Sequence, residues 1–379
     1  MYVPAWPGLS PGHFIRPPSA QEPPFPLKAP NKTYFYRARN AIYHLFRSLR
    51  VQHGETVLVP AYHSGNEVWA MRAAGASTRF YSIHRNLEPD LDELARLAKS
   101  ENARALFVIH FLGWPQPMKE LTALCRERGM ILIEDCALSL LSQPGGQPLG
   151  SWGDYAIFCL YKTLPVPNGG LLVQNGSVAG SLTAPELTPC DLASVAGRTT
   201  ELMLEWIRSR SDGAGAMLTG LKRLVGRTLS ALRLERLPVG DIGFDPASVN
   251  VGMSPLGLAL LKRCDYEEIR RRRRNNFLFL YQQLGGKVAV LREELEEGVC
   301  PLFFPLLVPD KAAAARALWD RGITAVEFWN SGDPEATRDA FPEAHFLRDH
   351  VLELPIHQDI TPSQLEYMAD QVLSLKRLI

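Results

Sequence analysis

An acid and a lysine stand at the ends of two apolar runs in the first half of this 379-residue chain. Asp135 ends the run MILIED, and Lys162 directly follows the run YAIFCLY. A carboxylate can keep a pyridine nitrogen protonated, and a lysine amine can form a Schiff base with an aldehyde. The pair therefore predicts the chemistry of pyridoxal 5'-phosphate (PLP).

Each of these two residues also has a purely structural alternative. An aspartate between a strand and a helix often caps that helix, and most lysines lie in solvent. Lys162 is followed by the loop TLPVPNGG, so we expect it to be held close to a buried strand end. Taken alone Asp135 fits the capping role better, and its pairing with Lys162 favours a cofactor site.

The elements around the pair alternate between short apolar runs and amphipathic segments. This alternation predicts an α/β fold built from βαβ units with a mostly parallel sheet. The strands are apolar throughout, as expected when helices cover both faces of the sheet. In such sheets ligands bind at the carboxyl ends of the strands, where Asp135 and Lys162 are expected. The expected helices cover residues 38–50, 67–74, 90–100 and 118–129, and the expected strands cover 56–61, 78–83, 105–111, 130–135 and 155–161.

Changes of pattern along the chain predict three parts. Residues 1–31 are rich in proline and lack periodicity, which predicts an extended arm that packs on the rest of the protein. Residues 32–247 are expected to form a large PLP-binding domain, and residues 248–379 a smaller C-terminal α/β domain. Further helices are expected at 199–207, 217–234, 311–322 and 361–378, strands at 303–308 and 323–328, and one long helix over 254–286.

Composition and charge exclude several classes of partner. The 41 lysines and arginines nearly balance the 40 acidic residues, so the net charge of +1 gives no reason to expect nucleic acid or an acidic membrane surface. Five consecutive arginines at residues 270–274 follow Glu267 and Glu268, which favours a solvated helix face with ion pairs over a nucleic-acid patch.

The cysteines and the apolar segments indicate the compartment. Six cysteines are scattered without a CxxC spacing, which favours reduced thiols in a cytoplasmic protein over disulfides or a metal site. The N-terminus shows no signal-peptide pattern. No uncharged apolar stretch reaches the roughly 18 residues that a membrane span needs.

Several longer segments, taken in order, resemble the DegT/DnrJ/EryC1/StrS family of sugar aminotransferases, which are PLP enzymes of fold type I. The resemblance runs over residues 35–379. It rests on ETVLVPAYHS, VIHFLGWPQPMKELTALCRERGMILIEDCA, LGSWGDYAIFCLYKTLPVPNGGLLVQN, SVNVGMSPLGLALLKRCDYEEIRRRR and VLELPIHQDITPSQL. No single motif is decisive, but so many in one order are specific.

The resemblance assigns roles around the cofactor ring. Lys162 is the implied Schiff-base lysine, and Asp135 is the implied partner of the pyridine nitrogen. Ala137 matches the small residue that packs on one face of the ring. The other face is usually covered by an aromatic side chain in the loop PAYHS, so His63 or Tyr62 is the candidate.

The resemblance also implies where the phosphate binds. Arg39 and Asn40 stand where the family has a Ser-Gly-Thr helix start, and a position near a helix N-terminus suits an anion. Cys159 stands near the place of a phosphate-binding serine. Asn250 matches an asparagine that reaches the phosphate from the neighbouring subunit, which implies a homodimer with shared active sites.

The chain departs from the family pattern at several cofactor contacts. Leu138 replaces a glutamine or histidine, and the positions of other polar or charged contacts hold Ala38, Cys159, Asn168 and Gly252. Each lost contact would weaken cofactor binding by roughly 1–3 kcal/mol. His110 is expected to support the pocket rather than carry protons, and Asp154 to order its loop.

The implied reaction is transfer of an amino group, with L-glutamate as donor and a nucleotide-linked keto-sugar as acceptor, in polysaccharide or natural-product biosynthesis. One alternative is a PLP enzyme of the same fold with a non-sugar acceptor. The sugar dehydratase branch of the family has histidine in place of the lysine, so Lys162 counts against it. The other alternative is a non-catalytic binding or regulatory paralogue, which the altered contacts motivate.

Overall fold

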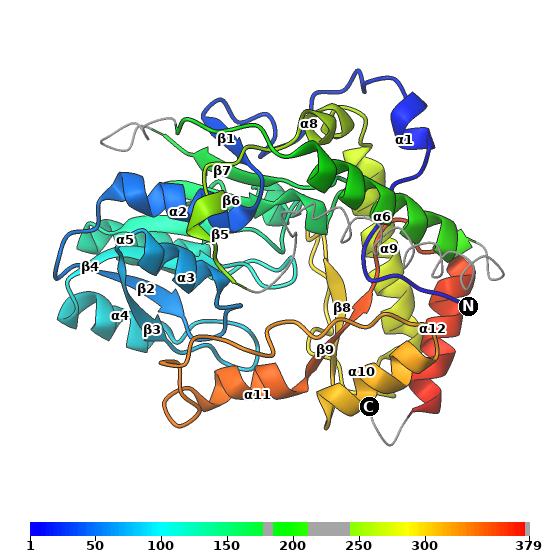
Figure 1. Cartoon of the computed structure of the whole chain (residues 1–379). Coiled ribbons are helices and arrows are strands. Elements are labelled where there is room, and N and C mark those ends of the chain that lie inside the picture. Colours follow the sequence, from blue (N-terminus) through cyan, green and yellow to red (C-terminus); the bar gives the residue numbers. More distant parts are fainter. Residues whose placement is uncertain (177–184, 211–242, 376–379) are drawn as a thin grey trace.

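A seven-stranded sheet organises the first half of the chain in the computed structural model, which describes residues 1–176, 185–210 and 243–375 (Figure 1). Its strands lie in the order β1-β7-β6-β5-β4-β2-β3, and only β7 runs against the others. The mostly parallel sheet predicted from the sequence is confirmed. The seven strands are β1 Lys32–Phe35, β2 Thr56–Pro60, β3 Ser77–Tyr81, β4 Ala103–Ile109, β5 Ile131–Asp135, β6 Tyr155–Cys159 and β7 Gly170–Gln174.

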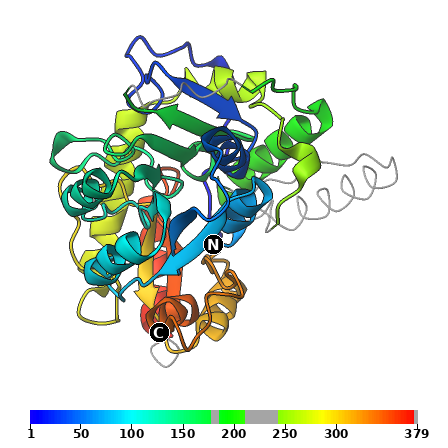
Figure 2. The same ribbon diagram turned by 90° about the vertical axis from the view of Figure 1, so that its left-hand side faces the viewer.

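Helices lie on either side of this sheet (Figure 2). Capping residues mark the ends of some of these helices. Asp90 accepts the Glu93 N–H at the start of α4, and Gly129 adopts a φ of 65° after α5. The four helices expected in this region are present within about two residues of the expected bounds. They are α2 Ala38–Leu49, α3 Asn66–Ala73, α4 Leu91–Ser100 and α5 Met118–Arg128.

A second, two-stranded antiparallel sheet forms in the C-terminal part from β8 (Phe303–Leu307) and β9 (Val351–Pro355). In Figure 2 it lies on the lower side of the molecule, in yellow and orange. The helices α10 (Lys311–Asp320), α11 (Pro342–His350) and α12 (Pro362–Ser374) accompany it. The two sheets lie on either side of the domain boundary at 247/248, which stays a prediction.

Two expectations for the C-terminal part are wrong. The long helix expected over 254–286 is two helices, α8 (Pro255–Leu261) and α9 (Tyr266–Leu284), because Asp265 is extended and caps α9 by accepting the Glu268 N–H. The strand expected over 323–328 forms only isolated bridges, from Ile323 to Val3 and from Val326 to Glu353. Helix α11 and strand β9 were not expected.

Another helix, α6 (Leu192–Arg210), contains the one expected at 199–207. The helix expected at 217–234 lies outside the described residues. None of the described helices is long and apolar enough to cross a membrane. Three short 3-10 turns complete the described elements: η1 (Pro144–Gly146), η2 (Leu160–Lys162) and η3 (Pro246–Ser248).

The N-terminal arm packs on the body of the protein, as predicted. The Val3 N–H donates to the Gly322 carbonyl, and the Leu9 N–H donates to the Leu202 carbonyl. The Gly8 N–H donates to the Asp359 carboxylate at 3.0 Å. The arm also contains the short helix α1 (Gly12–Ile15). It therefore connects α6 with the C-terminal part.

Candidate active site

The carboxyl of Asp135 lies at the carboxyl end of β5 and is buried. Its Oδ1 accepts the Ala137 N–H at 2.8 Å, so the chain turns back over the carboxyl directly after the strand. Burial and the nearby Glu67 raise the pKa of Asp135 to about 7, against the lowering effects of the Ala137 N–H and the Lys162 charge. This carboxyl would be stabilised by a further cationic partner.

Lys162 ends the turn η2, which follows β6. Because β6 pairs in parallel with β5, its carboxyl end lies beside that of β5. The two residues thus lie at neighbouring strand ends, and the charge of Lys162 lowers the pKa of Asp135. Their roles toward a cofactor stay predictions. The Lys162 Nζ lies 5.3 Å from the centroid of the Phe328 ring, which comes from the C-terminal part of the chain.

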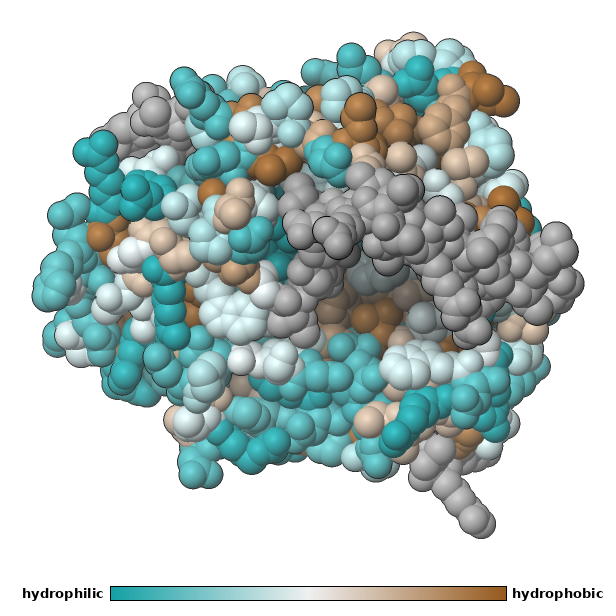
Figure 3. Space-filling model, in the orientation of Figure 1, coloured by the Kyte–Doolittle hydropathy of each residue, from teal (hydrophilic) through white to brown (hydrophobic). Residues whose placement is uncertain are grey.

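Apolar side chains line a narrow cavity beside Phe328, whose ring lies near Lys162. Leu138 is buried and lines a narrow cavity together with Tyr62, Phe328 and Trp329. Figure 3 shows a hollow near the centre of the face in view, with hydrophobic residues inside it. The leucine that replaces a polar residue of the family thus completes an apolar wall. Ala137, one residue earlier, is only half-buried.

The two candidates for covering the cofactor ring both pack against other rings. His63 stacks on Phe80 with centroids 5.3 Å apart, and its Nδ1 accepts the Gly65 N–H. Burial and the nearby Arg348 hold the pKa of His63 well below its usual value, so its ring is neutral. Tyr62 packs against Trp329 at 4.7 Å. Ring coverage by His63 or Tyr62 stays a prediction.

The start of α2 gathers two buried arginines, Arg37 and Arg39. Arg37 donates to the Ser248 hydroxyl, and the amide of Asn40 donates to the Ser248 carbonyl at 2.8 Å. A Cβ on Gly170 would clash with the Arg37 backbone, so the double glycine lets the helix start approach β7. The helix N-terminus and the guanidinium groups together suit an anion.

Cys159 at the end of β6 and Tyr161 in the Lys162 turn are the two titratable side chains just before the lysine. Burial raises the pKa of the Cys159 thiol, and burial raises the pKa of the Tyr161 phenol well above its usual value. Arg39 and Arg37 act in the opposite direction on Tyr161, so their charges lie near it. A neutral thiol is only a weak hydrogen-bond donor. The phosphate contact of Cys159 stays a prediction.

Asn250 is exposed in this chain. Its backbone carbonyl accepts the Thr188 N–H at 2.7 Å, and its side chain forms a hydrogen bond with His44 of α2. The neighbouring carbonyl of Val249 is 3.2 Å from the His44 Nε2. Asn250 therefore lies against α2, and its contact with a neighbouring subunit stays a prediction.

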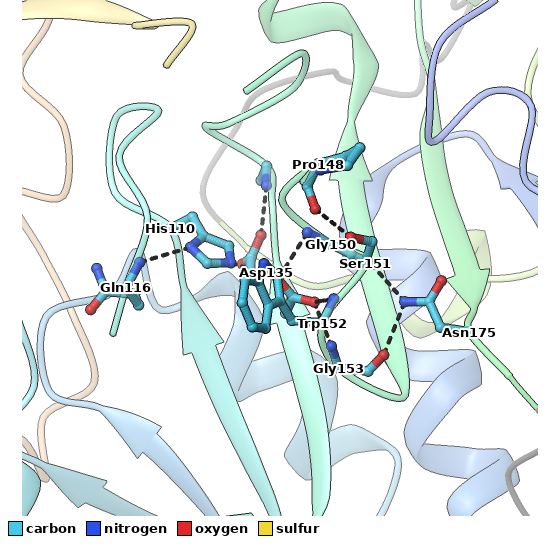
Figure 4. Close-up of polar contacts among 11 residues, drawn as sticks. His110, Gln116, Asp135, Pro148, Gly150, Ser151, Trp152, Gly153 and Asn175 are labelled. Atoms are coloured by element: carbon cyan, nitrogen blue, oxygen red, sulfur yellow. Dashed lines mark hydrogen bonds and ion pairs between the residues drawn. The ribbon is translucent and has the colours of Figure 1, made fainter. Parts of the chain in front are cut away.

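His110 belongs to a buried network that holds the loop 148–153 (Figure 4). Its Nε2 donates to Glu134 at 2.8 Å, and its Nδ1 accepts the Gln116 N–H at 3.2 Å. The Glu134 carboxylate also accepts the backbone N–H groups of three loop residues at 2.6–2.8 Å: Gly150, Trp152 and Gly153. His110 therefore supports the pocket, as expected from the sequence.

The same network includes a possible metal-ligand set, His110, Glu134 and Cys136, whose ligand atoms lie within 4.8 Å of one another. Both Glu134 oxygens and both His110 nitrogens already take part in hydrogen bonds within the protein. We therefore interpret the set as structural. Asp154 also orders its loop, because its carboxylate accepts the Leu132 N–H at 2.8 Å.

Glu67 is a site residue that the sequence analysis did not identify. It lies in the first turn of α3, is buried, and accepts the Ser64 hydroxyl at 2.7 Å. Its charge raises the pKa of Asp135. An acid in the first turn of a helix is common at the surface, so the sequence held no signal that this one is buried beside Asp135.

Comparison with known proteins supports the family resemblance. Residues 37–180 match the model of the DegT/DnrJ/EryC1/StrS aminotransferase family, which confirms the resemblance over this segment. A GDP-perosamine synthase of Vibrio cholerae is 26% identical over 155 residues, 40% of this chain and 42% of that protein. A dTDP-4-dehydro-2,3,6-trideoxy-D-glucose 4-aminotransferase of Saccharopolyspora spinosa is 32% identical over 121 residues, 31% of each chain. The chain thus spans less than half the length of these relatives.

A solved structure extends the likeness to the whole fold. The PMP form of a putative sugar aminotransferase from Streptococcus pneumoniae superposes with a TM-score of 0.70 at 14% identity. The match covers 100% of this chain and 98% of that one. The predicted fold-type I architecture, an α/β fold with a mostly parallel central sheet, is confirmed.

Proposed function

We propose that this chain, whose residues 37–180 carry the pattern of the DegT/DnrJ/EryC1/StrS aminotransferase family, is a PLP-dependent aminotransferase. The observation that carries the proposal is the placement of the buried Asp135 and of Lys162 at the ends of neighbouring parallel strands, close enough for the Lys162 charge to lower the pKa of Asp135. A buried acid and an amine beside it are the two groups that this chemistry requires.

The residues present fit PLP. Asp135 would hold the pyridine nitrogen, since its carboxyl has a pKa of about 7 and gains from a cationic partner. Ala137 would leave room for one face of the ring. Arg39 and Asn40, at the start of α2, would hold the phosphate with the support of the helix dipole. Asn250 of the neighbouring subunit would complete the site in a homodimer, and Cys159 would lie at its edge.

The protein groups then have defined tasks. When bound, PLP supplies an aldehyde that reacts with amines and a ring that acts as an electron sink. Lys162 would hold the cofactor through its Nζ and would serve as the proton-carrying base and acid. Asp135 would keep the ring nitrogen protonated. Phe328, beside the Lys162 Nζ, and Leu138, which lines the same cavity as Phe328, would limit the access of water.

We propose L-glutamate as the amino donor and a nucleotide-linked keto-sugar as the acceptor, in polysaccharide or natural-product biosynthesis. Names of relatives support this choice, since one is a GDP-perosamine synthase and another a sugar 4-aminotransferase. A cytoplasmic location is supported by the six cysteines, all of which are free and buried.

Visible absorption of the full-length protein with added PLP tests the proposal. We expect a band of lysine-bound PLP in the wild type that L-glutamate bleaches, and no such band in Lys162→Ala. Lys262→Ala, which removes an exposed lysine directly after α8, is the matched control and should keep the band. Absence of the band in wild type, with no borohydride-trapped adduct at Lys162, would contradict PLP binding. A band that no amino donor bleaches would contradict transamination and favour the non-catalytic alternative.

A further inference from the structure

The five arginines at residues 270–274 do not share one environment. Arg270 pairs with Glu267, and Arg271 and Arg272 pair with Glu268 at 2.7 and 2.8 Å. These pairs follow the helix spacing that the sequence predicted. Arg273 differs from its neighbours, because it is only 1% exposed and points into the protein from α9.

Within the described residues, the Arg273 guanidinium donates its hydrogen bonds to three neutral oxygens. Nε donates to the side-chain oxygen of Gln358 at 3.1 Å, Nη1 to the Leu302 carbonyl at 3.0 Å, and Nη2 to the Thr163 carbonyl at 3.3 Å. Burial lowers the pKa of Arg273 to about 10, so it still carries its charge at neutral pH. Burying a charge is costly, and the charge of Asp359 acts against the effect of burial on this pKa.

The contact with Thr163 lies directly beside the reactive lysine. Thr163 follows Lys162 and closes η2, with its N–H donating to the Leu160 carbonyl at 3.2 Å. Its own carbonyl also accepts the side-chain N–H of Gln358 at 3.1 Å. Arg273, Gln358 and the Thr163 carbonyl therefore form a closed triangle of hydrogen bonds. Two side chains of the C-terminal part fix the backbone of the turn that carries Lys162.

We propose that Arg273 and Gln358 form a clamp that positions Lys162 for reaction. Arg273 is a positioning residue here, since it acts through Thr163 and not on a substrate. A planar guanidinium holds three acceptors in fixed directions, which a lysine could not do. The role for the reaction rests on the proposed function, whereas the effect on the turn does not.

Loss of the clamp has two expected consequences. The turn at residues 160–164 should open more often, which raises local amide exchange without PLP. In the loaded enzyme, a misplacement near 1 Å should lower kcat by roughly 10–100-fold while KM for the amino donor changes little. Arg273→Lys should recover part of both losses, because it keeps the charge and one hydrogen bond.

Hydrogen exchange of the full-length protein, with and without PLP, tests the clamp in Arg273→Met, Arg273→Lys and Gln358→Leu. Arg271→Met is the matched control, since this exposed arginine lies on the same helix and only pairs with Glu268. We expect faster exchange, by roughly 10-fold, in the peptide over residues 160–165 and unchanged exchange in β5. The control should match the wild type in both peptides.

Several outcomes would overturn the clamp. Unchanged exchange at 160–165 in both Arg273→Met and Gln358→Leu would do so, as would a rise of equal size in β5, which would indicate general loss of stability. If Arg273→Met does not fold, Gln358→Leu decides, since it removes one bond to Thr163 and leaves the charge. Failure of the wild type to bind PLP would contradict the proposed function but leave the exchange result intact.

Discussion

Asp135 and Glu67 place two buried carboxyl groups at one end of the main sheet. The charge of Glu67 raises the pKa of Asp135, and Lys162 opposes it. Arg37 and Arg39, at the start of α2, stand near the phenol of Tyr161. The charged residues of the candidate site are therefore grouped, with the acids Asp135 and Glu67 in one place and two arginines in another.

The raised pKa of Asp135 predicts a pH-dependent stability in the protein without PLP. Its pKa is about 7 in the folded protein and 3.8 in the reference state, so the folded protein binds the extra proton. Stability from this group is thus present at low pH and lost as pH rises from about 4 to 7, by at most roughly 4 kcal/mol.

Urea unfolding at several pH values, for wild type and Asp135→Asn, measures this effect. We expect the difference in unfolding free energy between the two proteins to change in that pH range and to level off above it. Asp154→Asn serves as the control, because its carboxylate orders another loop. A difference that stays constant with pH would contradict the raised pKa.

Several helices in this protein begin at residues whose side chains accept free backbone N–H groups of the first turn. The break between α8 and α9 depends on Asp265, whose carboxylate accepts the Glu268 N–H at 3.0 Å. Asp265→Ala should therefore lower the unfolding free energy by about 1 kcal/mol, while Asp265→Asn should keep most of it. Equilibrium urea denaturation followed by circular dichroism checks the pair. Equal losses in both variants would argue against the cap.

The sequence was sufficient for elements whose signals are local. The strands that end at Asp135 and before Lys162 are mostly apolar runs, and the alternation of strands and helices up to β5 predicts a mostly parallel sheet. The break between α8 and α9 was not predicted, because Asp265 is one of many polar residues in the segment 254–286 and the pattern of the segment does not mark it as a cap. Residues 323–328 have the sequence pattern of a strand, but in the structure they form only isolated bridges and no continuous ladder.

The candidate site could be predicted only where its residues lie close in sequence. Asp135 and Lys162 were found from strand ends, but Phe328 reaches Lys162 from the C-terminal part. Arg273 looked like one of five solvated arginines, since periodicity does not say which face of α9 meets the Lys162 turn. Such contacts join segments more than a hundred residues apart, and no local pattern encodes them.

At the scale of the whole molecule, Arg348 joins the two parts of the chain. It is 5% exposed and donates to the Ala61 and His63 carbonyls after β2. It also donates to the Trp329 and Ser331 carbonyls, next to Phe328. One guanidinium thus connects the loop after β2 to the segment that faces Lys162.

Arg348→Met should separate these two segments and leave carbonyls without donors. We expect the unfolding free energy to fall by about 2–4 kcal/mol, because several buried hydrogen bonds are lost together. Arg338→Met, which removes an exposed arginine that pairs with Asp349, should leave it nearly unchanged. Gly332→Ala provides an independent test, since its Cβ would clash with the Arg348 guanidinium. An Arg348→Met protein of unchanged stability, with unchanged amide hydrogen exchange in the loop after β2 and in the segment next to Phe328, would show that the two parts are held together by apolar packing alone.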